Sequence, residues 1–245
     1  NAFTIEDFNA VVQMVLGELN GSHLGIGAPA PDTPPPGTGA LGVVWDESFR
    51  GPGARVQRVI PRSPASRAES RLRPGDVVLT VDGEGISPTT NVWALLLDKV
   101  NRRVLLTVSG EAAAPAPAVR DVVIRPISTG DETTLIYDEW VARRRAIVDS
   151  LSGGRLAYAY MPDTGGEGLA AFDRDYYSQL DKEGLVLDER YNGGGKVADY
   201  VVHTLAHDVM CYWMTRDGWL GRTPVGTLDG PKVMNGASDL MVAVF

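Results

Sequence analysis

Apolar residues recur at helical spacing near the start of the chain, over Thr4–Leu19. Thr4 and Asp7 are spaced as in a capping box, which favours a helix start. An Asn-Gly pair after this run supplies a helix stop. The pattern therefore predicts one amphipathic helix, followed directly by Ser22 and His23.

Two segments rich in proline and alanine interrupt the periodic pattern. Residues 28–39 hold five prolines, and residues 111–120 read EAAAPAPAVR. Such composition is typical of extended linkers. We therefore expect a helical piece over residues 1–27, a compact domain over 40–110 and a second domain over 121–245.

The two predicted domains differ in how their elements alternate. Within 40–110, short strand-like runs are separated by Gly, Pro and Asp turns, as in RLRPGDVVLTVDGEGI, and predict a small β-rich domain. Within 121–245, strand-like runs alternate with helical runs, which predicts an α/β layer with a largely parallel sheet. The expected fold class is therefore α/β with several domains.

Composition narrows the class of partner. The chain has 245 residues, of which 44% are hydrophobic and 22% charged, enough for packed domains. A net charge of −8 argues against a general nucleic-acid or anionic-membrane binder, and no apolar run approaches the length of a membrane span. Cys211 is the single cysteine, so an intrachain disulfide is impossible, which fits a reducing cytosol.

A glycine turn, read RYNGGG, follows a predicted buried strand at Arg190–Gly195. In open α/β sheets, ligands sit at the carboxyl ends of the strands. Successive glycines let backbone N–H groups approach a phosphate or the oxyanion of a scissile carbonyl, although the Walker and G-x-G-x-x-G patterns are absent. A tight strand-to-helix turn without a ligand explains the spacing equally well.

Ser238 and His23 are candidates for nucleophilic chemistry. Ser238 follows a predicted short strand and a Gly-Ala pair, as in a nucleophile elbow. The G-x-S-x-G pattern is absent, however, and a helix N-cap explains Ser238 better when it is taken alone. His23 lies in a predicted loop and is a candidate general base, yet a lone histidine is more often incidental.

Two further groups have both functional and structural explanations. His203 and His207 lie four apart on a predicted helix, a spacing that can bind zinc. No third ligand is evident, so a solvated or half-buried helix face is favoured and no metal is predicted. The aromatic segment Met210–Trp219 suits a pocket, a subunit contact or a core.

Taken together, these segments resemble tricorn-type proteases, which are serine peptidases of the C-terminal-processing superfamily. The segments ALGVVWD and RLRPGDVVLTVDGEGI resemble a bacterial-type PDZ domain, and LAYAYMPD, GLVLDERYNGGG and GPKVM resemble the peptidase core. The segment GELNGSH resembles the Gly-x-Ser-His segment that precedes the PDZ domain in the family. The resemblance implies a PDZ-like domain followed by a ClpP/crotonase-like α/β core.

The resemblance also implies roles for single residues. Ser238 is the expected nucleophile, His23 the general base, and Ser22 a hydrogen-bond partner that orients the imidazole. The expected oxyanion hole is formed by backbone N–H groups of Gly193–Gly194 and of Asp239.

The PDZ-like segment has an implied site of its own. Such domains bind an extended peptide as an added strand at a sheet edge. Leu41, Gly42 and Val43 are expected on the binding strand. The partner helix is expected at Trp93–Leu97 or, in a permuted arrangement, at Ala65–Ser70. A spacer that binds no peptide is an equal alternative.

The chain also departs from the family pattern. Fewer residues than usual separate the GPKVM strand from Ser238, and Leu240 stands where a glycine usually follows Ser-Asp. The family's orienting glutamate lies well beyond the nucleophile, whereas this chain stops at Phe245. We therefore expect a truncated core with weak or no activity.

Two functions of different classes follow. The first is a serine peptidase that acts on short peptides without a cofactor, as a homo-oligomer in the cytoplasm. The second is a PDZ-type peptide-binding module with an inactive or truncated core. An esterase of the α/β-hydrolase type is a third, weaker alternative.

Overall fold

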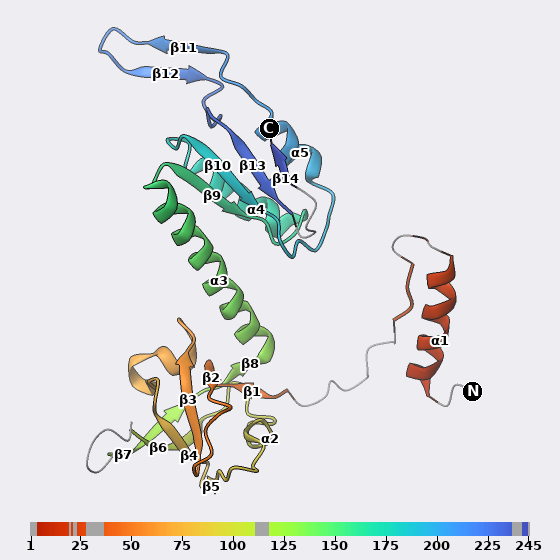
Figure 1. Cartoon of the computed structure of the whole chain (residues 1–245), viewed down its shortest axis with the longest axis vertical. Helices are drawn as coiled ribbons and strands as arrows, with labels where there is room; N and C mark the ends of the chain where they lie inside the picture. Colours follow the sequence, from red (N-terminus) through yellow and green to blue (C-terminus); the bar gives the residue numbers. More distant parts are fainter. Residues whose placement is uncertain are drawn as a thin grey trace. The chain divides into compact units, whose positions relative to one another are not determined.

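The computed structural model describes residues 4–19, 21, 24–27, 37–110, 118–236 and 242–244 of the chain (Figure 1). The chain divides into two compact units. Unit 1 comprises Asn1–Val59 with Arg67–Thr129, and unit 2 comprises Ile60–Ser66 with Gly130–Phe245. Helices and strands occur in both units, which confirms the expected α/β multi-domain class.

The elements of unit 1 are short, and most of them are strands. They are α1 (Ile5–Glu18), β1 (Gly39–Ala40), β2 (Val43–Trp45), β3 (Ala54–Val59), a 3-10 turn (Ala68–Ser70), β4 (Val77–Val81), β5 (Glu84–Gly85), α2 (Val92–Leu95), β6 (Val104–Ser109), β7 (Val119–Ile124) and β8 (Ile127–Ser128).

Helix α1 forms where the apolar spacing predicts it. The Thr4 hydroxyl accepts a hydrogen bond from the Asp7 N–H at 3.1 Å, and the Asp7 carboxylate accepts one from the Thr4 N–H at 3.2 Å. The predicted capping box is therefore confirmed. None of the helix residues that the structure describes is buried, and Phe8 is 50% exposed.

The main sheet of unit 1 is antiparallel. Its strands follow the order β2-β3-β4-β6-β7, with β5 paired to β4, and the short strands β1 and β8 pair separately. Along β6, the buried residues Val104, Leu106 and Val108 alternate with more exposed neighbours. One face of the sheet is therefore core and the other is solvated, as is usual for antiparallel sheets.

Strand β7 lies in a different place from the one that the linker composition predicts. We expected the chain after residue 120 to enter the α/β layer, but β7 pairs with β6 from Val104↔Ile124 to Ser109↔Val119. Alternating apolar and polar residues predict a strand but do not indicate which sheet it joins. The nearest preceding strand in the sequence is the partner here, as in other antiparallel pairs.

The segment TTNVWALLLDKV (89–100) predicts a helix, but the helix that forms, α2, covers only Val92–Leu95. Helix α2 ends at Leu95, and the chain continues in turns. Asp98 and Asn101 have positive φ values of 57° and 59°, which a right-handed helix does not contain. The alternative helix at Ala65–Ser70 is replaced by two 3-10 turns, one in each unit.

Unit 2 contains the longer helices. Its elements are a 3-10 turn (Pro64–Ser66), α3 (Thr129–Ser152, whose first residue belongs to unit 1), β9 (Leu156–Tyr160), α4 (Gly166–Tyr177), β10 (Gly184–Asp188), α5 (Ala198–Leu205), β11 (Cys211–Met214), β12 (Leu220–Thr223), β13 (Lys232–Asn235) and β14 (Val242–Val244).

The sheet of unit 2 is largely parallel, as predicted. Its order is β14-β13-β10-β9, and β9, β10 and β13 run parallel while β14 is antiparallel to β13 (Figure 1). Side chains from one face of β9 and β10 pack against α4 and α5 in a single core. Its buried members are Ala157, Ala159, Met161, Phe172, Tyr176, Leu185, Leu187, Val201, Leu205 and Leu228.

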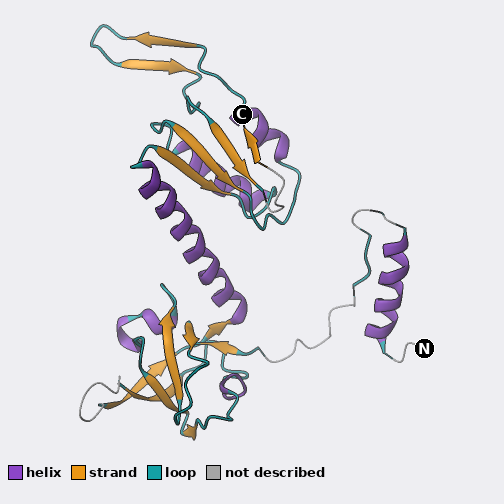
Figure 2. Cartoon of the chain, in the orientation of Figure 1, coloured by secondary structure: helices purple, strands orange, loops and turns teal. Residues whose placement is uncertain are grey.

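The aromatic segment after α5 forms a hairpin of β11 and β12, seen as paired strands in Figure 2. Helix α5 ends at Leu205, although the apolar pattern predicts helix to about Met210. Met210, Trp213 and Trp219 are 81%, 41% and 56% exposed, so the explanation of this segment as core is wrong.

No described helix has the length and apolar composition needed to cross a bilayer.

Candidate functional site

The carboxyl ends of three parallel strands meet at one edge of the unit 2 sheet. In the register, Asp188 at the end of β10 lies between Tyr160 of β9 and Asn235 of β13. The glycine turn Arg190–Gly195 follows β10, and the chain after Asn235 leads toward Ser238. Ligands in open α/β sheets bind at this edge, so the fold places both segments where chemistry is expected.

The glycine turn is held against the segment that follows β9. The Gly193 N–H donates to the Pro162 carbonyl oxygen at 2.9 Å, and the Thr164 N–H donates to the Gly194 carbonyl oxygen at 2.9 Å. The Asn192 side chain completes the turn, because its Oδ1 accepts from the Gly194 N–H at 2.7 Å. The turn therefore has a defined shape although its glycines are exposed.

Two of the glycines are required by the backbone itself. Gly194 has a φ of +84°, which favours glycine strongly. A Cβ on Gly195 would lie only 2.1 Å from the carbonyl carbon and oxygen of Thr164. The turn must therefore be glycine-rich whatever it binds, which is the structural explanation that the sequence left open.

The two glycine donors expected in an oxyanion hole already have acceptors. The Gly193 N–H is bonded to Pro162 and the Gly194 N–H to the Asn192 side chain. Hydrogen bonds in a free active site are often rearranged when substrate binds, so either donor can serve an oxyanion once it leaves its present acceptor. It identifies Asn192 as the side chain that competes for the Gly194 donor.

The carboxylate of Asp188 is the centre of a buried network at the start of the turn. Its Oδ1 accepts from the backbone N–H and Nε of Arg190 at 3.1 and 2.9 Å, and its Oδ2 accepts from Nη2 of Arg190 at 2.5 Å. Oδ2 also accepts from the Tyr158 hydroxyl at 2.8 Å. Burial acts to raise the pKa of Asp188, but hydrogen bonds from Arg190 and Tyr158 outweigh it and hold the pKa below its usual value.

An aromatic cluster covers this network from the side of α3. The Trp140 ring lies 4.9 Å from the Arg190 guanidinium carbon and contacts the rings of Tyr160 and Tyr191 edge-on. The Tyr160 hydroxyl donates to the Arg190 carbonyl oxygen at 3.1 Å and is also hydrogen-bonded to the Tyr137 hydroxyl. The first residues of the turn are therefore fixed from both the sheet and α3.

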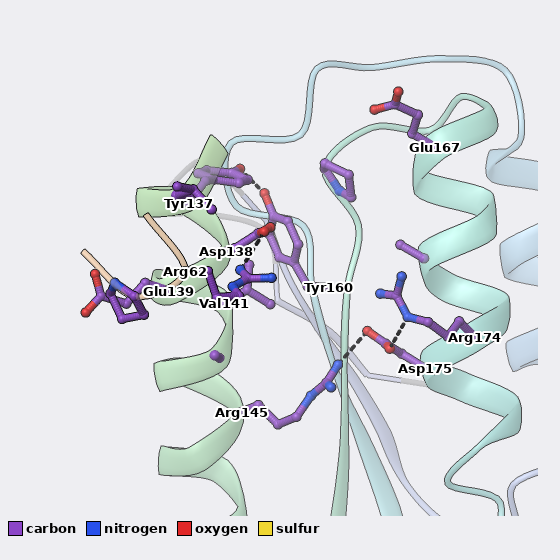
Figure 3. A pocket seen from close by; sticks show the side chains of 15 residues that line it. Arg62, Tyr137, Asp138, Glu139, Val141, Arg145, Tyr160, Glu167, Arg174 and Asp175 are labelled. Atoms are coloured by element: carbon purple, nitrogen blue, oxygen red, sulfur yellow. Dashed lines mark hydrogen bonds and ion pairs between the residues drawn. The ribbon is translucent and has the colours of Figure 1, made fainter. Parts of the chain in front are cut away.

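A pocket of about 650 Å³ opens beside this cluster, with α3 and α4 on either side of β9 (Figure 3). Tyr160 and Pro162 line it at the end nearer the glycine turn. Deeper along the helices, Asp175 accepts from Arg145 at 2.6 Å and from Arg174 at 3.0 Å (Figure 3). The pocket therefore combines aromatic and paired charged groups.

Glu189 differs from its neighbour Asp188. It is half-buried, and burial raises the pKa of its carboxyl above the usual value. Its backbone N–H donates to the Asn235 carbonyl oxygen at 2.8 Å, which ties the end of β10 to the end of β13. Glu189 lies close in sequence to the glycine turn, and a shifted carboxyl pKa is common among residues of functional sites.

Four of the predicted catalytic groups lie outside the described residues: Ser22, His23, Ser238 and Asp239. Their roles stay predictions. His203 and His207 lie 4.4 Å apart between ring centroids and are both exposed, and His207 lies beyond the end of α5. Among the residues that the structure describes, no group of three or more His, Cys, Asp or Glu side chains is arranged to hold a metal.

Of the three residues predicted on the peptide-binding strand, only Val43 lies in a strand, β2 at an edge of the unit 1 sheet, whereas Leu41 and Gly42 lie between β1 and β2. Strand β2 is the first in the strand order and pairs on one side with β3. Leu41 and Val43 are only 1% and 5% exposed, so their side chains belong to the core of the unit. A peptide here would pair with the main chain of β2. Exposed apolar side chains in the same unit are Trp93 in α2 and Leu97, which forms a β-bridge with Thr38 just before β1.

Known proteins match this architecture. Residues 55–109 match the family model of the PDZ domain. The chain is 35% identical over 228 residues to "Tricorn protease homolog 1" of Streptomyces coelicolor, covering 87% of this chain and 20% of that protein. It is 33% identical over 222 residues to "Putative tricorn protease homolog 2" of the same organism, covering 86% and 18%. The crystal structure of the tricorn protease matches with a TM-score of 0.74 at 25% identity, over 94% of this chain and 22% of that one.

The chain is of the tricorn type and carries a PDZ domain. This confirms the resemblance that the separate motifs indicate. The tricorn-type chain spans about a fifth of the length of the two Streptomyces relatives. The activity named in their titles belongs to proteins that are several times longer.

The network around Asp188 is not among the predicted site residues. The glycines of the turn are predicted for their backbone freedom, whereas the carboxylate and the arginine that precede them are not predicted. The signal was present, because an acidic residue at the end of a buried strand needs a partner and Arg190 stands two residues later. The contribution of Trp140 depends on the packing of α3, which the local sequence does not show.

Proposed function

We propose that this tricorn-type chain contributes the reacting groups of a serine peptidase that cleaves short peptides through an acyl-enzyme. The observation that carries the proposal is the parallel pairing of β10 and β13, with Asp188 opposite Asn235. Because of this pairing, the glycine turn and the chain leading to Ser238 leave the sheet at the same edge. Proteins named tricorn proteases share this sequence and fold, which supports a peptidase.

In this proposal, the Ser238 Oγ attacks the carbonyl carbon of the scissile peptide bond while its proton passes to His23. The tetrahedral intermediate collapses, the C–N bond breaks, and His23 gives the proton to the leaving amine. Water then attacks the carbonyl carbon of the acyl-enzyme, with His23 again accepting the proton. The bond between the acyl carbon and the Ser238 Oγ breaks, His23 returns the proton to that oxygen, and the free acid leaves. Ser22 orients the His23 imidazole by a hydrogen bond.

The backbone N–H groups of Gly193, Gly194 and Asp239 supply the oxyanion hole in this proposal. In the structure the Pro162 carbonyl oxygen holds the Gly193 N–H and the Asn192 Oδ1 holds the Gly194 N–H, so both donors have to exchange these acceptors for the oxyanion, and the Asn192 side chain has to turn away. The exposed position of the turn allows such a movement. Asn192 then acts as an internal acceptor that keeps the donor satisfied until substrate arrives.

Labelling with a fluorophosphonate probe tests the proposal. The probe should attach to Ser238, as identified by mass spectrometry, and the adduct should be absent in Ser238→Ala. The labelling rate should fall in His23→Ala and stay unchanged in His203→Ala, because His203 is an exposed histidine of unit 2 with no proposed role. A wild-type chain that is labelled at another serine, or labelled equally in His23→Ala, would contradict the assignment.

A peptide-binding module is the second candidate, and the edge position of β2 favours it. Fluorescence anisotropy of a labelled peptide library should then show binding that survives Ser238→Ala and weakens in Leu97→Ser. Leu105→Ser is the matched control, since Leu105 is exposed to a similar degree on the solvated face of β6 (42% against 48%). Equal binding by both leucine variants would remove this candidate.

The oligomeric state and the cellular location of the protein are part of the same proposal. A homo-oligomer is expected from the family resemblance, and the exposed hairpin of β11 and β12 provides apolar side chains suited to such a contact. A cytoplasmic location is expected from the single cysteine, Cys211, which is free and exposed. Sedimentation of the wild type and Trp213→Ser tests the first expectation.

A further inference from the structure

We infer that Asp188 and Arg190, supported by Tyr158 and Trp140, form a positioning fork that sets the geometry of the glycine turn. The inference rests on the proposed function for its catalytic consequence but not for its structural part. Neither Asp188 nor Arg190 is proposed to touch the substrate. Both act through the main chain that follows them.

The fork fixes the orientation of the Asp188 side chain. An ionised carboxylate offers about four acceptor positions, and four hydrogen bonds reach this one, three from Arg190 and one from Tyr158. Asp188 is 1% exposed and lies on a paired strand. A paired arginine and carboxylate of this kind hold both direction and distance, which a lysine cannot reproduce.

The fork also fixes the main chain of Arg190. Its N–H donates to Asp188 at 3.1 Å, its carbonyl accepts from the Tyr160 hydroxyl at 3.1 Å, and its side chain lies against Trp140. These contacts come from the end of β10, from β9 and from α3.

The next residue shows why such a hold is needed. Tyr191 has a φ of +64° although it is not glycine, and its ring is 70% exposed. A non-glycine residue in this region is strained and persists only when its surroundings impose the conformation. Arg190 imposes it from one side, and the hydrogen bonds of Gly193 and Gly194 impose it from the other.

The consequence for the proposed reaction follows from geometry. The N–H groups of Gly193 and Gly194 lie three and four residues beyond Arg190, so a change in the direction of the chain at Arg190 displaces both donors. Misplacing a catalytic group by about 1 Å can lower a rate by about a hundredfold. The fork is therefore expected to affect kcat more than KM.

Hydrogen exchange of single amides, followed by NMR in the full chain, tests the structural part without any substrate. In Arg190→Ala, the amides of Gly193 and Gly194 should exchange at least about tenfold faster, because the turn opens locally. The Leu185 amide, which donates to the Pro231 carbonyl oxygen and exchanges when the whole unit unfolds, should still exchange more slowly than both glycine amides. Arg190→Lys should lie between wild type and Arg190→Ala, since it keeps the charge and loses the fork.

The matched control is Arg155→Ala. Arg155 pairs with Glu183 near the opposite ends of the same two strands, and both side chains are exposed (67% and 63%). This variant should leave the exchange of Gly193 and Gly194 unchanged. The inference is overturned if Arg190→Ala leaves the exchange of both glycine amides unchanged, or if Arg190→Lys equals the wild type.

A second readout separates this inference from the proposed function. If the wild type forms the Ser238 adduct, kcat for a peptide substrate should fall by about a hundredfold in Arg190→Ala with KM changed less than threefold. A change confined to KM overturns the catalytic part. If the wild type forms no adduct, the proposed function fails, while the exchange result still decides whether the fork positions the turn.

Discussion

Two arginine–aspartate forks, one in each unit, differ in burial and in the oxygens they use, because Arg55 reaches only Oδ2 of Asp46 and Arg190 reaches both oxygens of Asp188. In unit 1, Asp46 accepts from Nε and Nη2 of Arg55, and the arginine lies 4.9 Å from the ring of Phe49. In unit 2, Asp188 accepts from the same two atoms of Arg190, which lies 4.9 Å from the Trp140 ring.

The remaining partners show what the difference means. Asp46 fills its other positions with Ser48, two residues away, whereas Asp188 uses Tyr158 from another strand. The side chain of Asp46 is 16% exposed and that of Asp188 is 2% exposed. The first fork closes a local turn, and the second connects β10 with β9 through a carboxylate that water hardly reaches. The two arginines are exposed to a similar degree (40% and 33%), so burial of the carboxylate is what gives the second fork the larger energetic weight.

The largest effect is expected from Arg190→Ala. Removing Arg190 leaves Asp188 buried with one side-chain partner, and this should lower the free energy of unfolding of unit 2 by about 2–4 kcal/mol. Urea denaturation followed by circular dichroism measures the loss. Adding Asp188→Asn should recover part of it, because the uncompensated charge is then gone. A loss no larger than that of Arg55→Ala would remove the distinction between the forks.

Tyr158→Phe should have an intermediate effect. It removes one hydrogen bond to the buried carboxylate and leaves the ring in place, for a loss of about 1–2 kcal/mol in the same denaturation experiment. Tyr212→Phe is the matched control, because its hydroxyl donates to Asp229 at 2.5 Å on the surface. If the two variants lose the same stability, burial is not what distinguishes the fork.

Arg55→Ala should cost little stability but change a titration. The hydrogen bonds from Ser48 and then from Arg55 lower the pKa of Asp46 to about 2 from 3.8. Because the folded pKa is depressed, the stabilisation is present above the unfolded pKa of 3.8 and is lost as the pH falls toward 2. The carboxyl ¹³C shift should titrate near 2 in the wild type and higher in Arg55→Ala. An unchanged midpoint would show that Ser48 alone holds the pKa.

Glu189→Gln should give the smallest change in stability and, unlike the other variants, should stabilise the protein at pH 7. Burial raises the pKa of Glu189, so the folded state favours its protonated form. The stabilising contribution is then complete below the unfolded pKa and is lost as the pH rises through the folded pKa. The glutamine variant should be slightly more stable than the wild type at pH 7 and equal to it at pH 4. Thermal unfolding at the two pH values measures this, and a less stable variant at pH 7 would reveal a partner for the carboxylate.

The outline of the fold was predictable because it depends on local periodicity. The capping box at Thr4, the alternation in β6 and the parallel character of the unit 2 sheet all follow from residue order. The position of β7 was not predictable in the same way, since alternation does not name a partner strand. The prediction of a longer helix at α2 was wrong for a local reason, because Asp98 and Asn101 have left-handed backbone conformations.

The site was predictable only where a single residue type was sufficient. The glycine requirement at Gly194 and Gly195 could be inferred from the run of three glycines. The competition of Asn192 for a donor and the stacking of Trp140 on Arg190 depend on side-chain packing between distant segments. Such contacts do not recur at a fixed spacing in the sequence, so they cannot be predicted from the apolar pattern.

The pairing of β7 with β6 bears on how unit 1 could be produced alone. A fragment that stops at Gly110, or one restricted to residues 55–109, lacks β7 and exposes the whole edge of β6. An unpaired edge of this length is a template for aggregation during expression. A well-behaved fragment has to begin before Val43 and end after Ile124, so the proline-rich stretch at 111–120 falls inside it rather than marking its end.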